Sequence, residues 1–110
     1  MELHWYAVRC VFRSAWAESD HVPDEQLYEE RITLWQARSL EDAIALAEAE
    51  AEDYAGDEDE YLDMAQAYQL PAAPGQGTEV FSLMRTSVME PDAYLDTFFD
   101  TGAERQQVLD

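Results

Sequence analysis

The chain has 110 residues, of which 47% are hydrophobic and 12% aromatic, and its formal net charge at pH 7 is −19. The length predicts one domain, residues 1–110, and the apolar content excludes a wholly disordered acidic chain. The negative charge argues against nucleic acid or an anionic membrane as a direct partner, because both need a positively charged surface.

The first two predicted elements are β-strands. Residues 3–12 are rich in aromatic and β-branched residues, and residues 27–37 alternate along their length. The segment between them, residues 14–26, has no periodicity, one proline and four acids, so it is predicted to be a long loop.

A helix is predicted to follow the second strand. Ser39 is suited to cap its N-terminus, and Asp42, three residues later, completes a variant of the capping box. Gly56 stands where a residue with positive φ would end the helix. The residues at helical spacing on the expected buried face are Leu40, Ala43, Ile44, Ala47, Ala51 and Tyr54.

Three further elements are predicted in the C-terminal half. Residues 60–70 fit a strand or a helix, and we favour a strand because the segment is short and the turn 71–77 follows directly. Residues 78–88 are predicted as a strand, and residues 90–102 as a helix with Pro91 near its start and Gly102 at its end. The expected buried face of this helix is formed by Tyr94, Leu95, Phe98 and Phe99.

The predicted order ββαββα indicates an α+β fold. Its simplest packing is a four-stranded, mostly antiparallel sheet with both helices on one face. This order equals a ferredoxin-like βαββαβ unit with its last strand moved to the front, that is, a permuted ferredoxin-like fold. The comparison is one of topology and carries no function.

In such a fold the second face of the sheet is open. We expect Trp5 and Trp35 on it, which makes an unusually large apolar patch for a monomer. A homodimer or another partner is favoured as the cover, with the C-terminal tail as the alternative. Together with charged residues on the same face, the tryptophans would form a small pocket or a dimer patch. The residues of this predicted site are Trp5, Arg9, Glu30, Arg31 and Trp35.

A run of acids with no base follows the central helix. The candidate partner-binding residues on the helix and the turn after it are Glu48, Glu52, Asp57, Glu58, Asp59 and Glu60. The run is either a solvated acidic surface or a docking surface for a basic protein. A calcium-binding EF-hand loop is excluded, because the fifth and sixth positions counted from Asp57 are Tyr61 and Leu62. Trp16, flanked by acids in the long loop, is either a contact hot spot or a cap on the sheet edge.

No residue set predicts catalysis, a cofactor or a metal site. His4 and His21 lack neighbours at ligand spacing, and Ser82 has no base in view. Cys10 is a lone cysteine in an apolar run and is predicted to be a core thiol. The N-terminus does not resemble a signal peptide and no apolar stretch has the length of a membrane span, which favours the cytoplasm.

Five stretches of the sequence, taken in order, resemble a small bacterial family filed as domain of unknown function 4288. They are "WYAVRCVFR", "YEERITLW", "SLEDAIALAEAEAEDYA", "EVFSLMR" and "PDAYLDTFFDTGAERQ". The resemblance spans nearly the whole chain and implies a single soluble bacterial domain. It brings no activity and no catalytic residue with it.

These observations favour a non-catalytic protein-interaction module, either an adaptor or an immunity-type protein that binds a basic partner. One alternative is a nucleic-acid mimic, in which carboxylates imitate phosphates. Another is a small-molecule binder or enzyme that uses Arg9, Glu30 and Arg31 on the open face.

Overall fold

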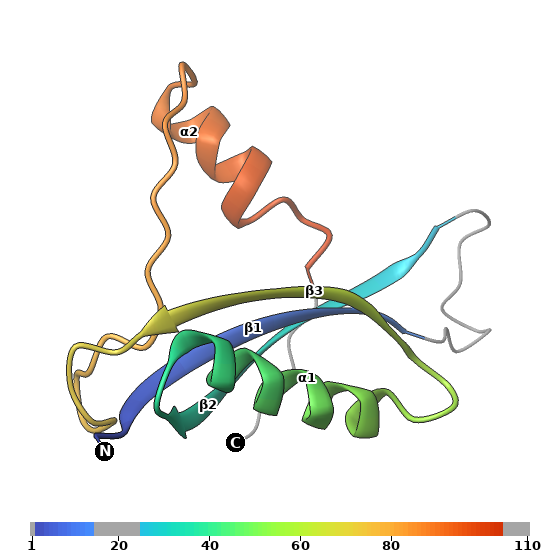
Figure 1. The fold of residues 1–110 in the computed structure, drawn as a ribbon. Helices are drawn as coiled ribbons and strands as arrows, with labels where there is room; N and C mark the ends of the chain where they lie inside the picture. Colours follow the sequence, from blue (N-terminus) through green and yellow to red (C-terminus); the bar gives the residue numbers. More distant parts are fainter. Residues whose placement is uncertain (1, 15–24, 105–110) are drawn as a thin grey trace.

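The structure is a computed structural model and describes residues 2–14 and 25–104. Most of the predicted 14–26 loop, including Trp16 and His21, therefore lies outside the described residues. The elements, shown in Figure 1, are β1 (His4–Ser14), β2 (Leu27–Ala37), α1 (Leu40–Ala55), β3 (Glu60–Gln69), α2 (Pro91–Tyr94) and a π-helical turn, η2 (Leu95–Phe99). The predicted α+β class, both N-terminal strands, the central helix and the strand at 60–70 are confirmed.

The strands form an antiparallel sheet in the order β2-β1-β3. One face, here called the helix face, carries Tyr6, Val8, Cys10 and Phe12 of β1, all of which are buried. Strand β1 lies between β2 and β3, and its successive side chains alternate between this face and the other one, on which Ala7 is also buried. The hydrophobic core therefore lies between the helix face and α1.

Helix α1 packs on the helix face through four buried alanines spaced four residues apart: Ala43, Ala47, Ala51 and Ala55. Small side chains at this spacing form a narrow stripe that lets the helix lie close to the sheet. Leu40 and Tyr54, which were predicted to be buried, lie beside this stripe and are exposed. The Oγ of Ser39 accepts a hydrogen bond from the backbone N–H of Asp42 at 3.1 Å, so the predicted cap is confirmed.

The fourth predicted strand is not part of the sheet. Among the described residues only β1, β2 and β3 pair, and residues 78–87 have no strand partner. Instead of joining a sheet edge, Phe81 lies over the face opposite α1, where its ring is 5.8 Å from that of Tyr68 and 5.3 Å from the guanidinium of Arg9. A segment that lies over a face cannot also pair with an edge. The structure confirms an α+β fold with a three-stranded antiparallel sheet, but not the permuted ferredoxin-like order.

The second helix is also placed differently from the prediction. Figure 1 shows α1 on one side of the sheet and α2 on the other, where α2 stands away from the strands. Within the described chain, α2 and η2 contact each other but no other helix or strand. The predicted buried face of Tyr94, Leu95, Phe98 and Phe99 is consequently not buried. We call residues 78–104 the C-terminal arm.

A bilayer-spanning helix would have to be both long and apolar, and none of the helices in residues 2–14 and 25–104 has that combination.

Candidate functional site

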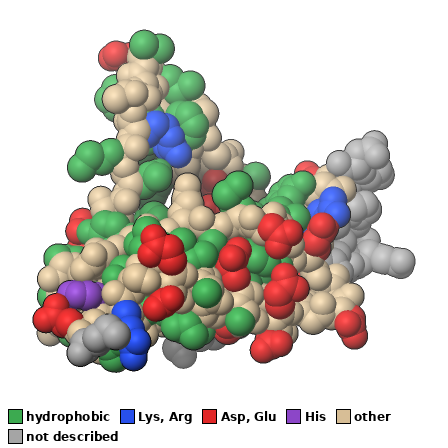
Figure 2. All heavy atoms as spheres, in the orientation of Figure 1, with side chains coloured by type: hydrophobic (Ala, Val, Ile, Leu, Met, Phe, Trp, Pro, Cys, Tyr) green, Lys and Arg blue, Asp and Glu red, His purple; other side chains and the backbone are tan. Residues whose placement is uncertain are grey.

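Acidic side chains gather on α1 and on the turn that joins it to β3. Helix α1 has no basic residue in its last turn, and Figure 2 shows acids scattered over the face of the molecule that carries this helix. The partial negative charge at the helix C-terminus adds to theirs, so the arrangement does not favour stability. We call Glu52, Asp53, Asp57 and Glu58, which are all exposed, the acidic surface.

The predicted partner-binding acids do not all have the same surroundings. The carboxylate of Glu48 accepts a hydrogen bond from the hydroxyl of Tyr61 at 2.6 Å, and Glu60 forms an ion pair with Arg13. Asp59 is half-buried. Apart from Glu60, which is exposed but paired, the exposed members of the predicted set are Glu52, Asp57 and Glu58, so a docking partner would meet these first.

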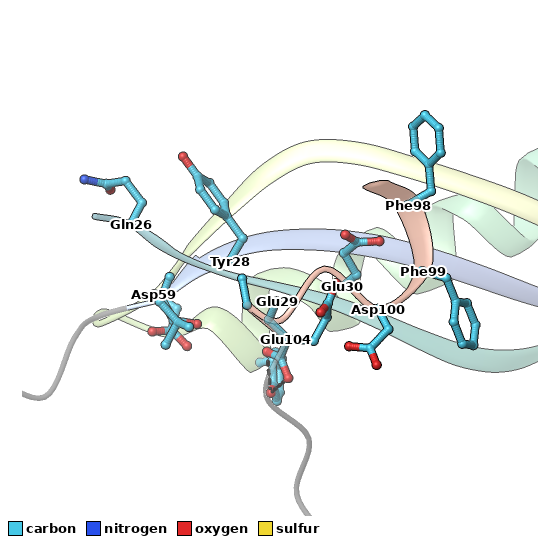
Figure 3. Close-up of a pocket in the computed structure, with 13 residues that line it drawn as sticks. Gln26, Tyr28, Glu29, Glu30, Asp59, Phe98, Phe99, Asp100 and Glu104 are labelled. Atoms are coloured by element: carbon cyan, nitrogen blue, oxygen red, sulfur yellow. Dashed lines mark hydrogen bonds between the residues drawn. The ribbon is translucent and has the colours of Figure 1, made fainter. Parts of the chain in front are cut away.

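A hollow of about 1180 Å³ adjoins the acidic surface at the free edge of β2 (Figure 3). It lies between the first residues of β2 and residues 98–104, and Asp59 of the acidic turn forms part of its wall. Its lining includes five carboxylates and four aromatic rings but no lysine or arginine: Glu29, Glu30, Asp59, Asp100 and Glu104, with Tyr28, Tyr54, Phe98 and Phe99. Such a lining suits a cationic ligand, which can pair with the carboxylates and lie over the rings.

Sequence reasoning missed most of this hollow. Of its five carboxylates, only Glu30 and Asp59 are among the residues singled out from the sequence, and they were assigned to two different sites. The available signal was the adjacent pair Glu29 and Glu30 at the start of an edge strand. Consecutive residues of a strand point to opposite faces, so the two carboxylates lie on either side of the edge. The contribution of residues 98–104 depends on where the arm returns, which no local pattern indicates.

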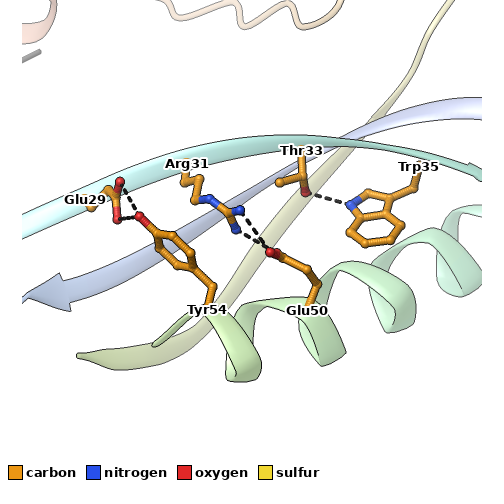
Figure 4. A network of polar contacts seen from close by, with 6 residues as sticks. All are labelled: Glu29, Arg31, Thr33, Trp35, Glu50 and Tyr54. Atoms are coloured by element: carbon orange, nitrogen blue, oxygen red, sulfur yellow. Dashed lines mark hydrogen bonds and ion pairs between the residues drawn. The ribbon is translucent and has the colours of Figure 1, made fainter. Parts of the chain in front are cut away.

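One wall of the hollow is fixed by a polar network between β2 and α1 (Figure 4). The guanidinium of Arg31 donates to both carboxylate oxygens of Glu50, at 2.6 and 2.9 Å, and lies 3.7 Å from the centre of the Tyr54 ring. The hydroxyl of Tyr54 donates to the carboxylate of Glu29 at 2.8 Å. The hydrogen bonds from Arg31 lower the pKa of Glu50, and the carboxylate of Glu29 raises the pKa of Tyr54.

The predicted open-face set is divided between the two faces of the sheet. Residues paired across antiparallel strands share a face. Trp5 is paired with Gln36, Arg9 with Ile32, and Glu30 with Val11, so these three predicted residues share the face opposite α1, here called the open face.

Arg31 and Trp35 were wrongly placed on the open face. They are paired with Cys10 and Tyr6, so they lie on the helix face. The indole of Trp35 donates to Thr33 Oγ1 at 2.6 Å and packs against the core, and Arg31 is held by Glu50. A pocket that uses Arg9 and Arg31 together is therefore excluded.

On the open face, Arg9 is occupied by several partners. It forms an ion pair with Glu30 at 3.5 Å, donates a hydrogen bond to Gln66, and stacks on the ring of Phe81. Its charge is thus balanced within the face. Exposed apolar side chains of this face include those of Tyr28, Ile32 and Leu34.

The remaining candidate reactive groups have structural surroundings. Burial raises the pKa of the Cys10 thiol, and burial together with the hydrogen bond to Glu48 raises the pKa of Tyr61. A thiol with a raised pKa is a poor nucleophile at neutral pH. His4 lies 3.2 Å from the carboxylate of Glu2. No group of three histidine, cysteine or acidic side chains in the described chain could hold a metal ion.

No protein-family model matches the chain, and searches of curated proteins and of solved structures find no match either. A functional assignment therefore depends on the geometry of the acidic surface and of the hollow beside it. Their common property is negative charge at the accessible end of α1 and along the edge of β2.

Proposed function

We propose that this protein is a non-catalytic protein-interaction module that binds a basic partner through its acidic surface and the adjoining hollow. The observation that carries the proposal is the lining of the hollow, which combines five carboxylates and four aromatic rings with no lysine or arginine. Arginine and lysine side chains of a partner are complementary to both groups, because carboxylates accept their hydrogen bonds and rings attract their charge.

The position of the hollow supports a polypeptide partner. It follows the edge of β2, and an edge strand presents unpaired backbone N–H and C=O groups that an extended segment can use. An adaptor would use this surface to recruit its partner, whereas an immunity-type protein would use it to block a basic working surface of the partner. We expect the module to act in the cytoplasm, where a lone free thiol such as that of Cys10 is kept reduced.

The two alternatives have less support from the arrangement of side chains. A small-molecule site that uses Arg9, Glu30 and Arg31 is divided by the sheet, since Arg31 lies on the other face. A nucleic-acid mimic would present a row of free carboxylates. Here Glu48 accepts a hydrogen bond from Tyr61 and Glu60 is paired with Arg13, so the row is interrupted.

The proposal is tested by titrating the protein with a short oligo-arginine peptide and following backbone NMR signals. We expect shifts at Glu29, Glu30 and Asp59, and weaker binding as salt rises, because exposed charges are screened within about 10 Å at 0.1 M salt. The triple variant Glu52→Gln, Asp57→Asn, Glu58→Gln should bind less tightly. A matched control, Glu90→Gln, Asp92→Asn, Asp96→Asn, removes the same charge from the arm and should bind like the wild type.

The same variants are then used to isolate partners from lysate at low and high salt. We expect a basic protein that the wild type and the control retain and the triple variant loses. Equal retention by all three proteins, or no salt dependence of binding to the peptide, would contradict the proposal.

A further inference from the structure

The C-terminal arm has regular structure but leaves its apolar side chains exposed. Met84 and Phe99 are 94% and 75% exposed, and Val88 is fully exposed. Helical segments shorter than about 12 residues are marginal in water unless an apolar face packs on something. Since α2 and η2 together cover residues 91–99 and contact no other described helix or strand, the arm needs a surface to cover it.

The arm is nevertheless an ordered unit. Arg85 donates to the hydroxyl of Tyr94 at 2.8 Å, and its guanidinium lies 4.1 Å from the centre of the Phe98 ring. At the base of the arm, Phe81 is anchored to Tyr68 and Arg9 of the open face. These contacts hold the extended segment against the helical segment and direct both away from the sheet (Figure 1).

The open face offers the complementary surface. Its exposed apolar side chains, which include Tyr28, Ile32 and Leu34, lie on the side of the sheet from which the arm projects. Exposed apolar surfaces of this kind mark interaction sites when they are contiguous. Each copy of the chain therefore carries two uncovered apolar surfaces, one on the arm and one on the sheet.

Charge limits how a second copy can approach. Two chains of net charge −19 repel each other, and the described part of the arm carries six acids and one arginine, Arg85, so the apolar contact has to offset this repulsion. On the open face Arg9 is paired with Glu30, whereas the acidic surface lies at the end of α1 on the other side. Contact through the open face thus keeps the two acidic surfaces apart.

We infer that two copies of this chain exchange their C-terminal arms, so that the arm of each packs on the open face of the other. A two-fold arrangement covers both apolar surfaces of both copies at once, so neither surface is left to bind a third copy. The acidic surfaces stay outside the contact, and the dimer presents two of them, which strengthens binding to any partner with two basic sites. Phe98 and Phe99 belong both to the contact and to the lining of the hollow, so arm exchange leaves the carboxylates of the hollow, but not these two rings, to a basic partner.

The first test measures the mass in solution by light scattering and sedimentation over a range of concentrations. The wild type should have twice the 12.6 kDa mass of one chain. Replacing two exposed arm residues, Phe98→Asp and Phe99→Asp, should raise the dissociation constant at least about 30-fold, as the loss of a contact hot spot does. Met84→Glu, which changes a side chain that is 94% exposed, should weaken the dimer without disturbing the fold, as judged by circular dichroism.

The matched control is Leu46→Asp, an exposed apolar residue of α1 on the opposite side of the sheet, and it should leave the dimer intact. A wild type that stays monomeric up to about 1 mM, the weak end of specific association, would overturn the inference. A dimer that is disrupted by Leu46→Asp but not by the arm variants would also overturn it.

The second test identifies what covers the open face. In an equal mixture of isotope-labelled and unlabelled chains, filtered NOE spectra should show contacts between the Phe98 or Phe99 rings of one chain and the Ile32 or Leu34 methyl groups of the other. Contacts found only within one chain would mean that the arm closes on its own sheet. No contacts at all would leave the face to a different protein, and either result contradicts arm exchange.

Discussion

The guanidinium of Arg31 forms two parallel hydrogen bonds with the carboxylate of Glu50, 2.6 and 2.9 Å long, which join β2 to α1. This contact fixes the helix against the edge strand whose carboxylates line the hollow. It also shows that Arg31 has a structural task and is not available to a ligand on the open face.

We expect a double-mutant cycle with Arg31→Met and Glu50→Gln to give a coupling energy of about 1 kcal/mol in the free energy of unfolding. The planar fork of arginine matches both carboxylate oxygens, but side chains that are 27% and 33% exposed are partly screened by water. Urea unfolding followed by circular dichroism measures each variant.

The control for this cycle is Glu52→Gln on the same helix. It removes a carboxylate from the negative end of α1, so its unfolding free energy should be unchanged or slightly higher. A coupling energy of zero would mean that the Arg31–Glu50 pair has no net effect on stability.

The stability that Glu50 contributes should depend on pH with a defined sign. Arg31 lowers the pKa of Glu50 in the folded protein below its ordinary value of 4.5. The contribution is therefore complete above pH 4.5 and is lost as the pH falls through the lower folded value. The difference in unfolding free energy between the wild type and Glu50→Gln should be constant at neutral pH and shrink below pH 4.5. A difference that grows on acidification would contradict the assignment.

Gly56→Ala should destabilise the protein by about 1–3 kcal/mol through the backbone alone. Gly56 ends α1 with φ 60° and ψ −142°, a conformation that is essentially restricted to glycine, and a Cβ added there meets no atom within 4 Å. Asparagine, which tolerates the ordinary left-handed region, should not restore stability, since this ψ lies outside that region. Gly75→Ala is the control, because φ at Gly75 is not positive and its added Cβ makes an ordinary contact with Thr78. Thermal unfolding of the wild type and of each variant measures the change in stability.

Cys10 should react with a thiol reagent only when the protein unfolds. Its side chain is buried on the helix face, and burial raises the pKa of the thiol, so little thiolate is present or accessible at neutral pH. The labelling rate should rise in parallel with the unfolded fraction across a urea titration, and Gly56→Ala should speed labelling in proportion to its loss of stability. Fast labelling of the wild type in the absence of urea would contradict this prediction.

Local patterns in the sequence determined the elements of the N-terminal two thirds. Alternation predicted β2, the cap at Ser39 and the glycine at position 56 bounded α1, and the short segment at 60–70 with its following turn predicted β3. These features depend on residues close together in the chain, so they are visible before the fold is known. The acidic composition also indicated the chemistry of the partner that we propose.

Only the tertiary structure decided which side chains share a face. In the β1–β2 pair, even residues of β1 lie beside odd residues of β2, so Trp5 and Trp35 are on opposite faces. A tight hairpin would have fixed which residues of the two strands pair, but the long 14–26 connection does not. A shift of the pairing by one residue moves every side chain of a strand to the other face. The path of residues 78–104 was likewise undetermined, because an extended, apolar segment forms a strand only where another chain segment pairs with it.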